Sequence, residues 1–160
     1  MDRVMMVATN VAAVPAIIII RDDTVYRVLL HMSMMASIVF HAKVGATVST
    51  FYGRMMHTGF DGTHNQYSSD TWLFLDQLFA FLAMVGTLNR FGPIRSWPRS
   101  CQIHAQFAMT VMLIGEMVSL HTTHVIAHTM WHIAAFSLPW HLESNRLFMI
   151  SQYIKSMYTS

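Results

Sequence analysis

The amino-acid sequence predicts an all-α membrane protein, a polytopic transmembrane helical bundle of about five spans with a C-terminal amphipathic helix. The 160 residues are 54% hydrophobic and only 11% charged, whereas soluble domains contain about 25% charged residues. The apolar residues gather in stretches that approach the ~20 residues a helix needs to cross a bilayer. Polar segments separate these stretches, and the length suits a single membrane domain over residues 1–160.

The first two expected spans lie in the N-terminal part of the chain. Residues 4–20 (VMMVATNVAAVPAIIII) are apolar but are interrupted by Asn10 and Pro15. The letters RDD follow, without the small-residue cleavage site of a signal peptide, so we expect the segment to be retained. The second span, residues 25–45 (VYRVLLHMSMMASIVFHAKVG), begins directly after this charged turn.

Three further spans are expected after a polar connection at residues 46–70. The third covers residues 71–89 (TWLFLDQLFAFLAMVGTLN), and the segment RFGPIRSWPRS after it is typical of a loop because of its prolines. The fourth and fifth spans cover residues 103–121 and 123–138. Pro139 is expected to end the fifth span, because proline disrupts the interior of a helix.

Residues 141–158 form the expected amphipathic tail. Their apolar and polar side chains are interleaved as in a helix that lies on a bilayer or on a partner protein. The apolar members are Leu142, Leu147, Phe148, Ile150, Tyr153, Ile154 and Met157.

The distribution of Lys and Arg predicts the orientation of the bundle. Of the 10 such residues, seven lie in the first–second loop region, the third–fourth loop and the tail, and three lie on the other side. Because basic loops stay on the inner side of a membrane, we expect the tail inside and the N-terminus outside.

Several classes of protein are disfavoured by composition. The net charge of +2 comes without a basic run, which gives no support to nucleic-acid binding. The single cysteine, Cys101, excludes an internal disulfide framework and a CxxC metal site. The 10 histidines are unusual for such an apolar chain.

Polar side chains inside the expected spans indicate a site. An ionisable residue there costs about 2.5–3.5 kcal/mol on insertion scales, so it should face the bundle and have a partner. His31 and His104 lie close to the inner span ends, where an interfacial position is expected. Counted at 1.5 Å per residue, five other groups fall within a layer roughly 8 Å thick, which predicts one buried site. These groups are Ser37, His41, Asp76, His128 and His132.

Histidines also recur every fourth residue in the fifth span, at His124, His128 and His132, and therefore share a helix face. Three neutral imidazoles and one open position are the composition of a catalytic zinc site. A nearby carboxylate such as Asp76 can take a proton from the zinc-bound water, and the Ser37 hydroxyl can donate to a developing oxyanion. Two alternatives remain at this point: a hydrogen-bonded polar seam between helices, and ligation of haem.

Three sequence blocks carry a resemblance to a known family. They resemble the signature of the CREST superfamily of membrane hydrolases, which includes alkaline ceramidases, adiponectin/progestin-type receptors, Per1-like GPI-remodelling proteins and post-GPI-attachment phospholipases. That pattern is Ser-x-x-(Tyr/Phe)-His, then an Asp early in the next helix, then His-x-x-x-His. The blocks here are ASIVFHA (Ser37, Phe40, His41), LFLDQLF (Asp76) and HTMWHI (His128, Trp131, His132).

The resemblance implies Zn²⁺ held by His41, His128 and His132, with Asp76 and Ser37 beside the catalytic water. It also implies hydrolysis of an amide or ester bond in a membrane lipid. Members usually have seven helices, so five spans correspond to a reduced CREST-like core.

Two functions are therefore expected to compete. One is a small zinc-dependent lipid hydrolase. The other is a non-catalytic accessory subunit of a larger membrane complex, such as a mitochondrial respiratory assembly, with a structural or vestigial metal site. The sequence does not choose between the mitochondrial inner membrane and the ER or Golgi.

Overall fold

Helices make up the described part of the protein. The computed structural model describes residues 2–44, 66–117 and 121–159, and no strand occurs among them, which confirms the all-α prediction. In chain order the helices are α1 (Asp2–Thr9), η1 (Asn10–Ala13), α2 (Val14–Ile19), α3 (Thr24–Val44), α5 (Gln66–Phe91), η2 (Ile94–Ser96), α6 (Arg99–Met117) and α7 (His121–Thr159).

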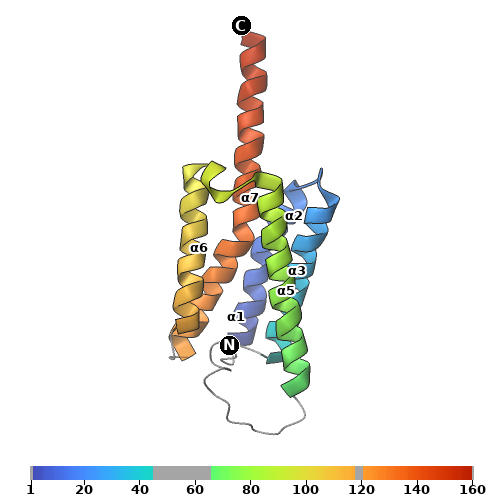
Figure 1. The fold of residues 1–160 in the computed structure, drawn as a ribbon, viewed down its shortest axis with the longest axis vertical. Helices are drawn as coiled ribbons and strands as arrows, with labels where there is room; N and C mark the ends of the chain where they lie inside the picture. Colours follow the sequence, from blue (N-terminus) through green and yellow to red (C-terminus); the bar gives the residue numbers. More distant parts are fainter. Residues whose placement is uncertain (1, 45–65, 118–120, 160) are drawn as a thin grey trace.

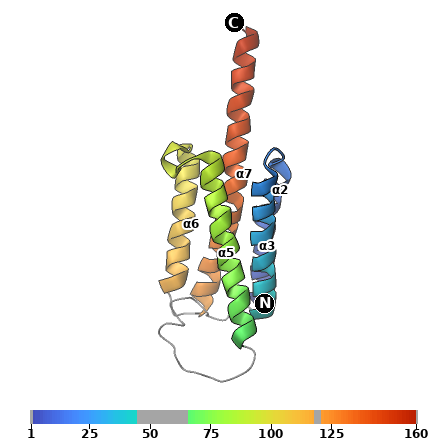
Figure 2. The same ribbon diagram turned by 45° about the vertical axis from the view of Figure 1, so that its right-hand side comes forward.

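The long helices form an elongated bundle (Figures 1 and 2). α3 packs along α5, and α6 packs along α7. The N-terminal elements α1, η1 and α2 pack against both α3 and α7, which joins the two pairs. The C-terminal part of α7 extends far beyond the other helices, and the N-terminus lies toward the opposite end (Figure 1).

One helix has the length and composition of a membrane span. Among the described residues, Thr24–Ala42 of α3 is the stretch long and apolar enough to cross a membrane by length and composition. Val7–Ile19 is apolar but shorter. α7 contains five histidines and four serines, which lower its hydropathy. The arrangement of about five spans therefore remains a prediction.

Local sequence explains where α3 begins and α5 ends. The Asp23 side chain accepts a hydrogen bond from the backbone N–H of Tyr26 at 2.9 Å, so Asp23 caps the first turn of α3. Gly92 has a φ of 77°, a left-handed conformation that follows the last residue of α5. The Trp97 indole N–H donates to the Gly92 carbonyl at 2.9 Å and closes the turn. The predicted loop between the third and fourth helices is confirmed.

The contact between α3 and α5 is close. A Cβ atom at Gly86 would lie 2.8 Å from Cδ2 of Tyr26, so glycine allows the two helices to approach. The Tyr26 hydroxyl lies 2.6 Å from Thr87 Oγ1, and the Thr87 hydroxyl donates to the Ala83 carbonyl. These contacts fix the register in which α3 faces α5.

Some expected boundaries differ from the observed ones. α5 begins at Gln66 rather than at residue 71, and the rest of the expected 46–70 connection lies outside the described residues. The first expected span is a succession of α1, η1 and α2 rather than one regular helix.

The expected helix end at Pro139 is wrong. α7 continues through Pro139 as one helix of 39 residues, so the fifth span and the tail form a single element. The lower part of α7 is inclined and the upper part follows the long axis (Figure 1), as in a helix bent by proline. The Ser137 hydroxyl donates to the Ile133 carbonyl at 2.6 Å, and a His104 ring nitrogen lies 2.9 Å from the Ala134 carbonyl. These side chains bind backbone oxygens in the turn before the proline, and tertiary packing maintains the helix.

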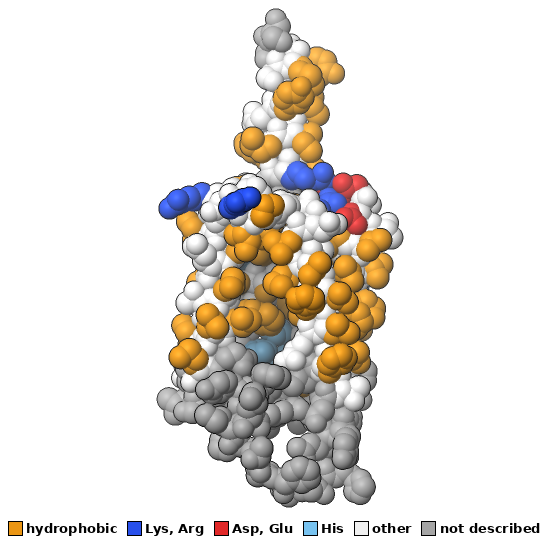
Figure 3. Space-filling view, in the orientation of Figure 1, with side chains coloured by type: hydrophobic (Ala, Val, Ile, Leu, Met, Phe, Trp, Pro, Cys, Tyr) orange, Lys and Arg blue, Asp and Glu red, His pale blue; other side chains and the backbone are white. Residues whose placement is uncertain are grey.

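A charged cluster lies where α7 leaves the bundle, close to the start of the protruding segment (Figure 3). Glu143 is 1% exposed and accepts hydrogen bonds from Arg90 at 2.9 Å and Arg146 at 2.6 Å. Arg90 also bonds Asp22 at 2.7 Å and contacts Asp23 at 3.4 Å. The hydrogen bond from Arg90 holds the pKa of Asp22 below its usual value. This cluster joins the α2–α3 turn, the end of α5 and α7.

Candidate metal centre

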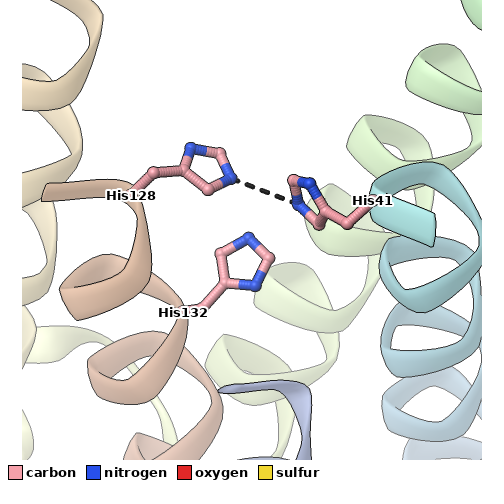
Figure 4. A group of neighbouring side chains, drawn as sticks. All are labelled: His41, His128 and His132. Atoms are coloured by element: carbon pink, nitrogen blue, oxygen red, sulfur yellow. Dashed lines mark hydrogen bonds between the residues drawn. The ribbon is translucent and has the colours of Figure 1, made fainter. Parts of the chain in front are cut away.

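Three histidines from two helices form the candidate centre. His41 lies in the last turn of α3, and His128 and His132 lie four residues apart on α7. The four-residue spacing places both α7 imidazoles on one helix face. They face His41 across the gap between the helices (Figure 4). We call these residues the histidine cluster.

The three imidazoles are close enough to share a ligand. His128 Nε2 lies 3.3 Å from His41 Nε2, and one nitrogen from each ring lies within 4.8 Å of the others. The ring centroids of His41 and His132 are 4.9 Å apart, and those of His128 and His132 are 4.6 Å apart. This group could hold a metal ion.

The donor set fits a zinc ion. Nitrogen atoms that bind one tetrahedral zinc at 2.0–2.1 Å lie roughly 3.3 Å apart, which matches the 3.3 Å between His41 and His128. Both ring nitrogens of His132 are buried and have no hydrogen-bond partner among the described residues. A buried imidazole without a partner is destabilising, and a metal ion would satisfy one of these nitrogens.

Apolar rings surround the histidine cluster. His132 is fully buried, and the centroids of Trp131 and Phe136 lie 4.9 Å and 5.6 Å from its ring. Phe40 packs against His41 with centroids 4.9 Å apart. His128 remains partly exposed. The centre is therefore enclosed around His132 and His41 and more open beside His128.

Ser37 and Asp76 meet across the α3–α5 interface. Ser37 lies one turn before His41 on α3 and is 1% exposed. The Asp76 carboxyl of α5 lies near the Ser37 hydroxyl, but Ser37 Oγ makes no hydrogen bond of standard geometry with a described residue. The structure thus brings Ser37 and Asp76 together, and their catalytic roles remain predictions.

The other expected histidines have different surroundings. His31 is exposed and contacts the Arg27 carbonyl at 2.9 Å. His104 is partly buried, and its Nδ1 lies 3.2 Å from Nδ1 of His141. The side chain of His124 lies outside the described residues.

Sequence reasoning missed the pair formed by His104 and His141. Because the Ala134 carbonyl can only accept, His104 Nε2 carries the proton, and its Nδ1 accepts from His141. His141 follows Pro139, where the helix was expected to end, so no spacing pattern linked the two histidines.

Comparison with known proteins adds no family assignment. No protein-family profile matches the chain. No curated protein and no solved structure matches it either.

Proposed function

We propose that this chain is an integral membrane protein that binds zinc at the histidine cluster and hydrolyses an amide or ester bond in a lipid. The observation that carries the proposal is the convergence of His41, His128 and His132 in an enclosed site. The order of the Ser37–His41, Asp76 and His128–His132 blocks, which resembles the CREST pattern, supports it. The candidate span Thr24–Ala42 supports the membrane location.

The residues have distinct roles in this proposal. His41, His128 and His132 would hold the metal through neutral ring nitrogens. A bound zinc lowers the pKa of its water ligand and polarises a carbonyl oxygen. Asp76 would accept the proton released from the attacking water and pass it to the leaving amine or alcohol. The Ser37 hydroxyl would donate a hydrogen bond to the negative charge that develops on the substrate oxygen.

A direct test measures zinc and hydrolysis in the purified protein. We expect about one zinc per chain, as in a three-histidine site, and loss of zinc in His128→Ala. His31→Ala is the matched control, because His31 is exposed and lies outside the cluster. Absence of zinc from the unmodified protein, or equal zinc in both variants, would contradict the metal proposal.

Asp76→Asn separates metal binding from catalysis. We expect this variant to retain zinc and to lose hydrolysis of short-chain ceramide or phospholipid, because the amide cannot accept the proton. Hydrolysis at the unmodified rate would show that Asp76 is not the base.

The protruding part of α7 favours a second function, that of an accessory subunit in a larger membrane complex. α7 has 39 residues, a length of about 58 Å, whereas the hydrocarbon core of a bilayer is about 30 Å thick. Beyond the charged cluster its apolar side chains are exposed, including Phe148 at 60%, Met149 at 65% and Tyr153 at 66%. A partner subunit would cover this surface. Zinc binding without hydrolysis, together with migration in a large complex in mild detergent, would favour this function.

A further inference from the structure

An open groove runs between α2 and α7 beside the charged cluster. Its volume is about 600 Å³, within the range of about 300–1,000 Å³ typical of small-ligand pockets. Val14, Pro15, Ile18 and Ile19 form one wall, and Trp140 and Leu147 form the other. Arg21 is the charged residue among those that line it.

The groove is apolar along its length and cationic at one end. Val14 and Arg21 are seven residues apart on one wall, and Trp140 and Leu147 are seven residues apart on the other. At 1.5 Å per residue each wall extends about 10 Å along the bundle. Arg21 follows the end of α2, on the same side as the charged cluster, so the cation lies at the polar end of the groove.

Arg21 differs from its basic neighbours. Arg90 and Arg146 are both engaged with carboxylates of the charged cluster. In the described part of the chain no carboxylate pairs with Arg21, and its Nε–H donates to the Ile18 carbonyl at 3.4 Å. Its guanidinium is exposed and can bind an anion in two-point geometry.

We propose that this groove binds an anionic phospholipid, with the phosphate at Arg21 and one acyl chain along Ile18, Val14 and Trp140. The Trp140 ring is 44% exposed, so it can contact an acyl chain in the groove. Basic pockets between helices on the inner side of a membrane bind anionic headgroups, and the Lys and Arg distribution predicts that this end of the bundle is the inner one. The inference rests on the membrane location in the proposed function but not on zinc.

Native mass spectrometry of the detergent-solubilised protein tests the site. Titration with phosphatidylglycerol should give one retained lipid per chain, and phosphatidylcholine should bind more weakly. Arg21→Gln should weaken phosphatidylglycerol binding about fivefold and leave phosphatidylcholine binding unchanged. Arg95→Gln is the matched control, because Arg95 is exposed in the α5–α6 connection and does not line the groove. An equal effect of the two substitutions would overturn the proposal.

Two further experiments separate the contact with the acyl chain from the contact with the phosphate. Ile18→Trp should fill the groove and reduce binding of phosphatidylglycerol, since Ile18 lines it. Glycerol phosphate, which has no acyl chain, should not compete with the lipid. Full competition would indicate a simple anion site and overturn the lipid assignment.

Failure of the groove to bind lipid can be told apart from failure of the proposed function. His128→Ala should lose zinc and keep the lipid, whereas Arg21→Gln should keep zinc. Failure of the chain to insert into phosphatidylcholine bilayers would overturn the membrane location itself. Successful insertion without selective lipid retention would overturn the groove alone.

Discussion

The charged cluster and the histidine cluster are both polar and partly buried, but their hydrogen-bonding capacity is met differently. Glu143 is 1% exposed and is bonded by two arginines, and those arginines also reach Asp22. His132 is fully buried, and neither ring nitrogen has a hydrogen-bond partner in the described residues. Glu143 and His132 lie about 16 Å apart along α7. Among the described residues, the carboxylate of the first cluster is fully paired, whereas the buried ring nitrogens of His132 in the second are not.

The largest expected effect comes from Glu143→Ala. Removal of one partner from a buried ion pair costs about 3–5 kcal/mol, because it leaves a poorly solvated charge behind. We expect a loss of that order in the free energy of unfolding, measured by denaturation in detergent. Arg95→Ala, which changes an exposed arginine outside the cluster, should have little effect. An unchanged free energy of unfolding in Glu143→Ala would show that the charged cluster does not stabilise the fold.

The second-largest effect is expected from zinc, which should stabilise the protein through the histidine cluster and not through the charged cluster. Zinc at a hundred times its dissociation constant should stabilise the protein by about 2.7 kcal/mol, and His132→Leu should abolish this gain. Without metal, His132→Leu should be neutral or stabilising, since it removes a buried polar group for which the described residues supply no hydrogen bond. Thermal unfolding with zinc and with a chelator measures both effects. A strongly destabilised metal-free His132→Leu protein would indicate that His132 already has a structural partner.

Gly86→Ala tests whether α3 and α5 must approach closely at Tyr26. The new Cβ would lie 2.8 Å from Tyr26 Cδ2, so a side chain or a helix must move. Such overpacking costs about 1–3 kcal/mol. Gly115→Ala is a milder control, because its nearest neighbour would be 3.5 Å away. A lower unfolding temperature for Gly86→Ala than for Gly115→Ala is expected.

The smallest expected effect is the acid sensitivity of the charged cluster. The hydrogen bond from Arg90 lowers the pKa of Asp22 below its ordinary value of 3.8. The stability contributed by Asp22 is therefore present above pH 3.8 and is lost as the pH falls through the lower, folded-state value. Asp22→Asn should flatten the pH dependence of the unfolding midpoint over this range. An unchanged acid dependence would show that other carboxylates dominate it.

Sequence patterns predicted the helical class and the members of the histidine cluster. Apolar stretches and the His128–His132 spacing are local properties, and helical geometry translates them directly into faces. The pairing of His104 with His141 was not predictable, because the two residues lie on different helices and no periodicity relates them. The same holds for Arg90 and Glu143, whose contact joins residues 53 positions apart.

By itself, the sequence determined that the chain is helical and which side chains each helix presents, since both follow from local composition and a 3.6-residue period. Tertiary structure alone decided that α7 continues through Pro139 and that His104 meets His141. It also decided that the α2–α7 groove ends at Arg21. These outcomes depend on how separate helices pack, because packing binds the backbone oxygens near a proline and brings together groups that are distant along the chain.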